Sequence, residues 1–152
     1  MEENTSLHTE CAHKPRPAVL NQFSRTELLL GEDNMQRLFN ARVAVFGIGG
    51  VGGYTVEALA RVGVGTLDLI DDDRICLTNL NRQIFATRKT IGKYKVDVAK
   101  ERILEINPKA VVNTYKTFYM PDTADQFDFS QYDSAFFNSR RITFANGQTE
   151  VS

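Results

Sequence analysis

The stretch FGIGGVGG, residues 46–53, holds five glycines in eight positions and follows an apolar run that begins at Val43. That run predicts a buried strand over residues 43–46, and apolar residues at helical spacing predict a helix over residues 51–62. A turn with so few side chains lets another molecule approach the backbone closely. Between a strand and a helix, such a turn is the usual place for phosphate, because the first amides and the dipole of the helix attract negative charge.

The rest of the chain continues this alternation of strands and helices. Residues 66–70 and 110–115 read as strands, and residues 95–106 read as an amphipathic helix between them. A helical pattern over residues 23–40, interrupted at Gly31, precedes the first strand, and the polar stretch 78–90 reads as loop or short helix. The order strand, helix, strand, helix, strand predicts an α/β fold with a Rossmann-like, doubly wound parallel sheet, of which this is a βαβαβ half.

Composition narrows the class of protein. The 152 residues are 42% hydrophobic and 24% charged with a net charge of -1, which is ordinary for about one soluble domain. That near balance gives no overall attraction to nucleic acid or membranes, although a local patch stays open. The polar N-terminus is unlike a signal peptide, no apolar run is long enough to span a membrane, and Cys11 and Cys76 are isolated. We therefore expect a cytoplasmic location and no membrane partner.

An acidic residue stands where a nucleotide's ribose would need one. Asp71 ends the second predicted strand, 19 residues after Gly52, and a carboxylate there can accept hydrogen bonds from ribose hydroxyls. Gly47 and Gly49 would permit the tight turn and the close approach of phosphate. Asp72 and Asp73 read as solvated turn residues or caps. These features predict a nucleotide, but NAD, FAD, S-adenosylmethionine and ATP all satisfy them.

The next stretch, LTNLNRQIFATRKTIGKYK at residues 77–95, favours chemistry at a phosphate over hydride transfer. Arg82 offers a planar fork for phosphate oxygens and Lys95 a mobile point charge. Asn79 and Gln83 can hold a triphosphate by hydrogen bonds. The simpler alternative is a solvated basic loop.

Four motifs in order, GIGGVG, LIDDD, TNLNRQ and GKYK, resemble those of the adenylating superfamily of ubiquitin-activating enzymes and their bacterial relatives. Some of these relatives activate the sulfur-carrier proteins of molybdopterin and thiamine synthesis. The longer segments FSRTELLLGEDNMQRL and TNLNRQIFATRKTIGKYK are most similar to bacterial tRNA threonylcarbamoyladenosine dehydratases. The resemblance extends from about residue 23 to residue 133.

The resemblance implies a role for each matching residue, with ATP and Mg²⁺ as cofactors. It assigns the nucleotide turn, the ribose acid and the phosphate-binding residues to Gly47, Gly49, Gly50, Gly52, Asp71, Asn79, Arg82, Gln83 and Lys95. Arg25 matches an arginine that relatives insert across a homodimer interface into the partner's ATP site, so the implied catalytic residues are Arg25, Arg82 and Lys95. The implied reaction is attack of a substrate carboxylate on the α-phosphorus. In the dehydratases that carboxylate belongs to the threonyl group of a modified adenosine in tRNA, and its acyl-adenylate closes into a cyclic form.

The pattern breaks at the C-terminal end. Residues 134–137 begin like a strand, but Asn138 and the residues after it are polar, and the expected D-x-x-D motif for Mg²⁺ does not follow. We therefore expect a flexible leader over residues 1–20, an adenylating domain over residues 21–133 and an atypical tail over residues 134–152. On this reading the domain is truncated after about three strands and contains no metal ligand. The chain alone would then be poorly soluble and inactive.

Four functions remain open from the sequence. The first is an ATP-dependent enzyme of the dehydratase type, and the second is an adenylyltransferase for a sulfur-carrier protein. The third is a nucleotide-binding or dimerisation module without catalysis. The fourth, an NAD-dependent oxidoreductase, suits the glycines and Asp71 but leaves Arg82, Gln83 and Lys95 unexplained.

Overall fold

A single parallel sheet organises the computed structural model, which describes residues 19–138, 141–143 and 149–151. The strands of this sheet are β1 (Arg42–Phe46), β2 (Thr66–Ile70), β3 (Val111–Tyr115) and β4 (Ser134–Phe137), in the order β3-β2-β1-β4. Every neighbouring pair is parallel. The α/β class and the doubly wound parallel arrangement predicted from the sequence are confirmed.

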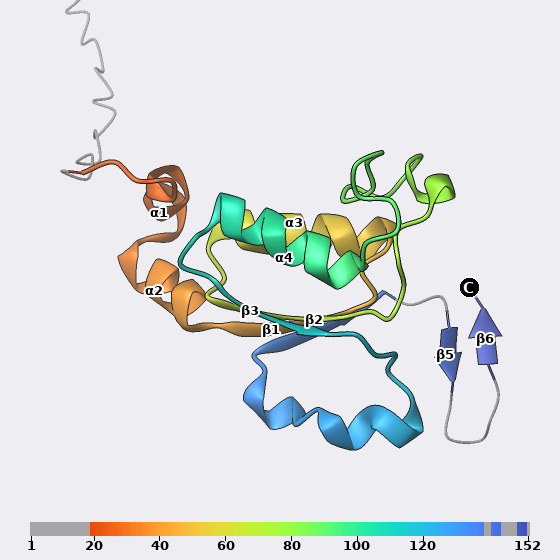
Figure 1. Cartoon of the computed structure of the whole chain (residues 1–152). Coiled ribbons are helices and arrows are strands. Elements are labelled where there is room, and N and C mark those ends of the chain that lie inside the picture. Colours follow the sequence, from red (N-terminus) through yellow and green to blue (C-terminus); the bar gives the residue numbers. More distant parts are fainter. Residues whose placement is uncertain (1–18, 139–140, 144–148, 152) are drawn as a thin grey trace, which may run out of the picture.

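Helices cover one face of the sheet (Figure 1). These are α3 (Gly50–Val62) and α4 (Lys95–Ile106), while α1 (Ser24–Leu30) and α2 (Glu32–Asn40) lie at the end where the strands begin. Gly31, at a φ of 84°, separates α1 from α2 where the sequence predicted an interruption. The main core lies between sheet and helices and contains Val43, Val45, Ile48, Val56, Leu67, Leu69, Val96, Ile103 and Val112, all buried. No helix in the described part of the chain is long and apolar enough to cross a membrane.

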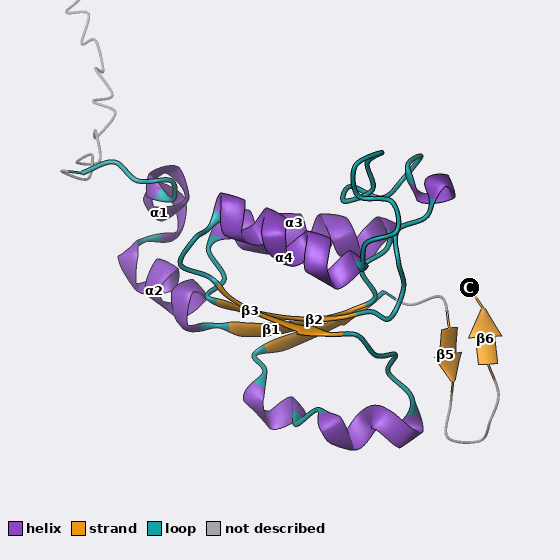
Figure 2. Cartoon of the chain, viewed as in Figure 1, coloured by secondary structure: helices purple, strands orange, loops and turns teal. Residues whose placement is uncertain are grey.

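The opposite face of the sheet is covered by the connection from β3 to β4 (Figure 2). This connection contains two short 3₁₀ helices, η2 (Pro121–Gln126) and η3 (Phe129–Gln131), and a third, η1 (Leu77–Asn79), follows β2. A second, mostly aromatic core forms beneath it around Phe46, Ile70 and Phe127. Strands β5 (Arg141–Thr143) and β6 (Thr149–Val151) pair with each other in a separate antiparallel sheet.

The fourth strand corrects one expectation from the sequence, which ended the sheet after about three strands. Ser134–Phe137 pairs with β1, from Val43 opposite Ser134 to Phe46 opposite Phe137. The N–H of Asn138 donates to the carbonyl of Phe46 at 2.8 Å, and the ring of Phe137 stacks on that of Phe46 at 4.6 Å. A strand of four residues is enough here, because β1 offers a backbone partner for each of them. The polar residues after Phe137 therefore do not prevent the pairing. The other limits of leader, domain and tail stay predictions, and residues 1–18 lie outside the described part.

A buried carboxylate holds the covering connection on the sheet. Asp68, in the middle of β2, has no exposed surface. Its Oδ2 accepts hydrogen bonds from Arg42 Nη2 and the Tyr132 hydroxyl, each at 2.7 Å, and its Oδ1 accepts one from Asn113 Nδ2 at 2.6 Å. Burial and the bond to Asp68 raise the pKa of Tyr132. Three of the four residues in this network lie on separate strands and the fourth, Tyr132, comes just before β4, so the network fixes where the chain enters β4.

Glu57 performs a similar task between the two helices. Its carboxylate accepts hydrogen bonds from Arg102 on α4 at 2.9 and 3.1 Å and from Arg61 on α3 at 2.7 and 3.0 Å. The Glu57 side chain is only 11% exposed, while both arginines are roughly half exposed. Hydrogen bonds from Arg102 and then Arg61 lower the pKa of Glu57, despite its partial burial. The carboxylate of Glu57 therefore links α3 to α4, and its hydrogen bonds to the two arginines stabilise its ionised form in the folded state.

Replacing Glu57 by Gln removes both ion pairs and should reduce the free energy of unfolding at neutral pH. The expected reduction is only about 1 kcal/mol, because water screens the charges of the two half-exposed arginines. The folded pKa of Glu57 lies below its ordinary value of 4.5. Its contribution is thus fully present above pH 4.5 and is lost as the pH falls through the lowered folded pKa. Urea unfolding at neutral pH and well below pH 4.5 should show the difference between wild type and variant shrinking in acid.

The control is Glu105→Gln, which changes the same charge on α4. Glu105 is 73% exposed and lies 3.8 Å from Arg102, so its loss should cost little. Equal destabilisation by the two substitutions, or a Glu57 effect independent of pH, would contradict the assigned role of Glu57.

Candidate functional site

A cleft of about 1400 Å³ opens where the strands end. Its walls come from the glycine turn after β1, the loop after β2 and the residues that follow β3 and β4. Ligands of open α/β sheets usually bind at this edge. Of the nine residues assigned to nucleotide binding, the cleft brings together eight: Gly47, Gly49, Gly50, Asp71, Asn79, Arg82, Gln83 and Lys95.

Gly52, the ninth, has a packing role in the structure. A Cβ atom added there would lie 1.7 Å from the carbonyl oxygen of Gly47, which no side chain can occupy. Gly47 itself has a φ of 86°, in the region that favours glycine. By contrast, a Cβ on Gly49 or Gly50 would meet nothing nearer than Gln83 or Arg82 at 3.8 Å, which is an ordinary contact. The turn thus needs Gly47 and Gly52 to fold, and its Gly49–Gly50 backbone faces the polar wall of the cleft.

Asp71 ties the end of β2 to the glycine turn. Its Oδ2 accepts a hydrogen bond from the N–H of Ile48 at 2.6 Å, and its Oδ1 accepts one from the N–H of Asp73 at 2.8 Å. Burial raises the pKa of Asp71, while these two amides and the charge of Lys95 act in the opposite direction. Each oxygen keeps further acceptor capacity. Binding of ribose by Asp71 stays a prediction, and the bracing of the turn is a role that the sequence did not indicate.

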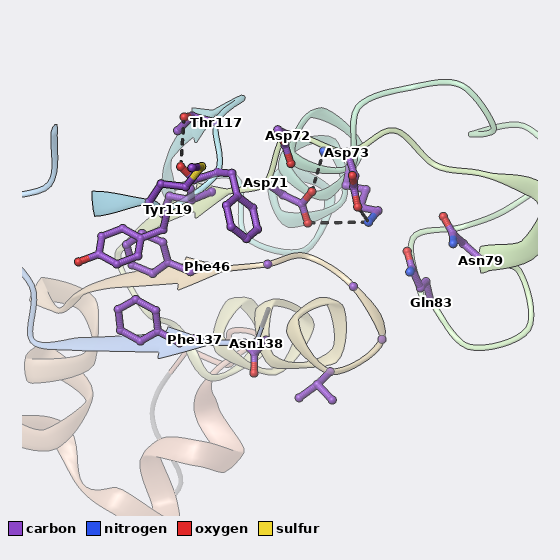
Figure 3. Close-up of a pocket in the computed structure, with 18 of the residues that line it drawn as sticks. Phe46, Asp71, Asp72, Asp73, Asn79, Gln83, Thr117, Tyr119, Phe137 and Asn138 are labelled. Atoms are coloured by element: carbon purple, nitrogen blue, oxygen red, sulfur yellow. Dashed lines mark hydrogen bonds and ion pairs between the residues drawn. The ribbon is translucent and has the colours of Figure 1, made fainter. Parts of the chain in front are cut away.

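Lys95 differs from the mobile charge expected at its position. It is the first residue of α4 and is only 6% exposed. Its Nζ lies 2.7 Å from Asp73 Oδ2 and 3.9 Å from Asp71 Oδ2 (Figure 3). Asp73 is therefore a site residue that the sequence analysis missed when it assigned a turn or cap. No local sequence pattern relates positions 73 and 95, which are far apart along the chain. A backbone hydrogen bond from the N–H of Lys95 to the carbonyl of Asp73, at 3.1 Å, brings them together.

The polar wall comes from the loop after β2. The Oδ1 of Asn79 accepts a hydrogen bond from the N–H of Cys76 at 2.9 Å and so caps η1. Arg82 is exposed at the mouth of the cleft, where its Nη1 donates to the carbonyl of Thr78 and to Asn81 Oδ1. Gln83 is buried. This wall presents amide and guanidinium donors opposite the glycine turn.

The other side of the cleft is aromatic, and the sequence analysis missed it. Figure 3 shows Phe46, Tyr119 and Phe137 grouped together, with the three aspartates between them and Asn79 and Gln83. The rings of Phe46 and Tyr119 meet edge to face at 5.1 Å. Three distant segments supply these rings, so only the strand order brings them together. The cleft therefore joins an aromatic side to a polar, cationic one, a combination that suits a nucleoside phosphate.

Asn138 also enters the site from the end of β4. Its Nδ2 is buried and has no hydrogen-bond partner among the described residues. Its Cβ lies 3.5 Å from the Cβ position at Gly52, so it stands beside the start of α3. A buried amide donor without a partner is uncommon, which makes Asn138 a candidate contact for a bound ligand or water. No sequence signal marked Asn138, because its position depends on the fourth strand.

One cluster of acidic residues in the described part of the chain has the geometry of a metal site. Asp71, Asp72 and Asp73 can bring carboxylate oxygens within 4.8 Å of one another. However, Asp71 accepts two backbone N–H groups and Asp73 holds the Lys95 ammonium. A cation would have to compete with that ammonium, so these residues do not fit a Mg²⁺ site.

Arg25 lies elsewhere. It is exposed on α1, at the end of the sheet opposite the cleft (Figure 1), and it does not line the cleft. A single subunit therefore does not bring Arg25 to the other site residues.

Comparison with known proteins identifies relatives of the same architecture. The chain is 49% identical over 109 residues to the tRNA threonylcarbamoyladenosine dehydratase of Bacillus subtilis, covering 72% of this chain and 43% of the relative. It also resembles the crystal structure of Escherichia coli tRNA N6-threonylcarbamoyladenosine dehydratase, TcdA, in complex with ATP. The TM-score is 0.76 at 42% identity, over 78% of this chain and 49% of that one. An adenylyltransferase and sulfurtransferase, uba4 of Aspergillus clavatus, is 34% identical over 86% of this chain and 28% of its own length.

The chain spans about two-fifths of the length of the curated dehydratases that it matches. The profile of the ThiF family matches residues 23–136, from α1 into β4. This match covers the glycine turn, the acidic strand end, the polar wall and Lys95, and the chain therefore belongs to the ThiF family.

Proposed function

We propose that the cleft binds ATP and that the chain forms the nucleotide-binding part of a cytoplasmic enzyme that activates a carboxylate by adenylation. The observation that carries this proposal is the convergence of the open start of α3, Arg82 and the buried Lys95 on one cleft. Hydride transfer needs no such cations, whereas phosphate chemistry does. The neighbouring structures with ATP and with AMP support the same ligand class.

In the proposed reaction, a carboxylate oxygen of the substrate attacks the α-phosphorus of ATP. The bond from that phosphorus to the bridging oxygen breaks, pyrophosphate leaves and an acyl-adenylate forms. Negative charge grows on the phosphate oxygens during this step. The first amides of α3, the Arg82 guanidinium and the Lys95 ammonium are already fixed at the cleft, so they stabilise that charge without the reorganisation that water needs.

The substrate that we propose is the threonyl carboxylate of a modified adenosine in tRNA. Three dehydratases of that name are 45–49% identical to this chain, while uba4 is 34% identical. The alternative is the C-terminal carboxylate of a sulfur-carrier protein, which the likeness to uba4 keeps open. Mg²⁺ is expected by resemblance, but no described residue is assigned to it and no step depends on it here.

Calorimetric titration of the 152-residue chain should show tighter binding of ATP than of NAD. Lys95→Ala should weaken ATP binding by about 10-fold or more, since one charge-assisted contact to phosphate is lost. Asp73→Asn should tighten it, because the ammonium then loses a competing anion at 2.7 Å.

The matched control is Lys100→Ala, which removes one positive charge from the same helix, α4, at a position that does not line the cleft. NAD binding more tightly than ATP would reject the proposal. Equal effects of Lys95→Ala and Lys100→Ala on ATP affinity would reject the role of Lys95. Because Lys95→Ala should weaken ATP binding and Asp73→Asn should strengthen it, a charge effect can be told apart from a general loss of folding, which would weaken binding in both variants.

We further propose that two copies form a homodimer in which Arg25 reaches the partner's cleft. Supporting this, α1 presents an apolar surface next to Arg25: Leu28, Leu29 and Leu30 are 40%, 83% and 37% exposed. Exposed apolar clusters of this kind usually mark contact surfaces. Arg25 does not line the cleft of its own subunit, so a role at an ATP site requires a second copy.

Leu29→Glu should produce a monomer in analytical ultracentrifugation and weaken ATP binding as much as Arg25→Ala does. Arg25→Ala should leave the mass of the dimer unchanged. Mixing Arg25→Ala and Lys95→Ala subunits should restore part of the ATP binding, since a mixed dimer contains one complete site. No recovery despite subunit exchange would refute action in trans, and Arg37→Ala on α2 serves as the charge-matched control.

A further inference from the structure

In the loop between β2 and α4, the part that follows the three aspartates at 71–73 carries charge of one sign. Residues 74–94 contain five cations and no aspartate or glutamate, a formal charge of +5. Because the whole chain totals -1, the remaining residues total -6. The near neutrality of the chain thus conceals a strong separation of charge.

Four of these cations form what we call the basic rim: Arg74, Arg88, Lys89 and Lys93. All four are exposed, and none of them lines the cleft. None forms an ion pair with any residue that the structure describes. The fifth cation, Arg82, lines the cleft and belongs to the same loop as the rim.

The rim rests on an ordered base. The N–H of Ile75 donates to the carbonyl of Lys93 at 2.9 Å, and the N–H of Gly92 donates to the carbonyl of Ile75 at 2.8 Å. Arg74 lies over the ring of Tyr94 at 4.0 Å and donates to the carbonyl of Gly92. The side chains of Ile75 and Phe85 are buried in the main core. The loop thus holds its backbone in place while its cations face water.

We infer that the basic rim binds the sugar–phosphate backbone of an RNA substrate whose modified nucleotide enters the cleft. This inference rests on the proposed function for the tRNA identity, but its charge argument is independent of ATP. Exposed cations that form no ion pair with any described residue suit a phosphate backbone, since each contact releases a condensed counterion. A protein partner would use the exposed apolar side chains of the same loop, Leu77 and Ile91, together with the cations.

The test measures binding of unfractionated bacterial tRNA to the 152-residue chain at several salt concentrations. The double variant Arg88→Ala/Lys89→Ala should weaken binding and make the logarithmic salt dependence shallower by roughly 1.5, at about 0.7–0.9 per lost cation. The control Arg37→Ala/Lys109→Ala removes the same two residue types from exposed positions on α2 and after α4. It should leave both quantities unchanged.

A measurement on the wild-type chain avoids any effect of substitution on folding. Bound tRNA should protect Lys89 and Lys93 from an amine-reactive reagent, whereas Lys109 should react at the same rate with and without tRNA. Equal protection of all three lysines, or equal losses in the two double variants, would overturn the inference. Strong binding of polyglutamate with no affinity for tRNA would also overturn it, in favour of an acidic protein.

ATP titration of the same samples separates this inference from the proposed function. Because the rim lies outside the cleft, Arg88→Ala/Lys89→Ala should bind ATP like the wild type. Failure to bind ATP with rim-dependent tRNA binding intact would reject the adenylation proposal alone. Normal ATP binding with rim-independent tRNA binding would reject the rim alone.

Discussion

The hydrogen bond from the N–H of Ile48 to Asp71 joins two of the segments that line this cleft. It joins the glycine turn after β1 to the end of β2, and Asp71 in turn accepts the N–H of Asp73, which holds Lys95. One buried carboxylate thus aligns the turn, the acidic strand end and the first residue of α4. Its burial raises its pKa and disfavours the charge, and that cost is partly offset by donors that are part of the site itself.

The charges of Lys95 and Asp73 are paired within the cleft. The Lys95 ammonium has the Asp73 carboxylate as a partner at 2.7 Å, so it is not an unpaired buried charge. A phosphate that approaches this ammonium replaces an anion that is two-thirds exposed and readily hydrated. The ion pair therefore keeps the lysine in position while leaving it available to a stronger anion.

Much of this arrangement could be predicted from the sequence, because strong local patterns carry it. The glycine turn lies between a strand and a helix, and Asp71 stands at a strand end, so neither depends on distant residues. The features that were missed depend on long-range pairing: Asp73 meets Lys95 through backbone bonds, and Phe46, Tyr119 and Phe137 come from three segments. The sequence indicated the start of a strand at residues 134–137, but four residues give too short a pattern to outweigh the polar residues that follow, so the sheet was expected to end one strand early. The packing of Gly52 against Gly47 was also not indicated by the sequence, and the assignment of Gly52 to the nucleotide turn stays a prediction.

The strand order β3-β2-β1-β4 has a consequence for how the chain folds during synthesis. The first strand to leave the ribosome needs the last one as its neighbour: the N–H of Arg42 binds Asp133, 91 positions later. Until residue 138 has emerged, the β1, β2, β3 unit presents an open edge at β1, next to the glycine turn. Closing so long a loop is slow compared with local pairing. Docking of β4 would then be the late step that completes both the aromatic side of the cleft and the protection of β1 from wrong partners.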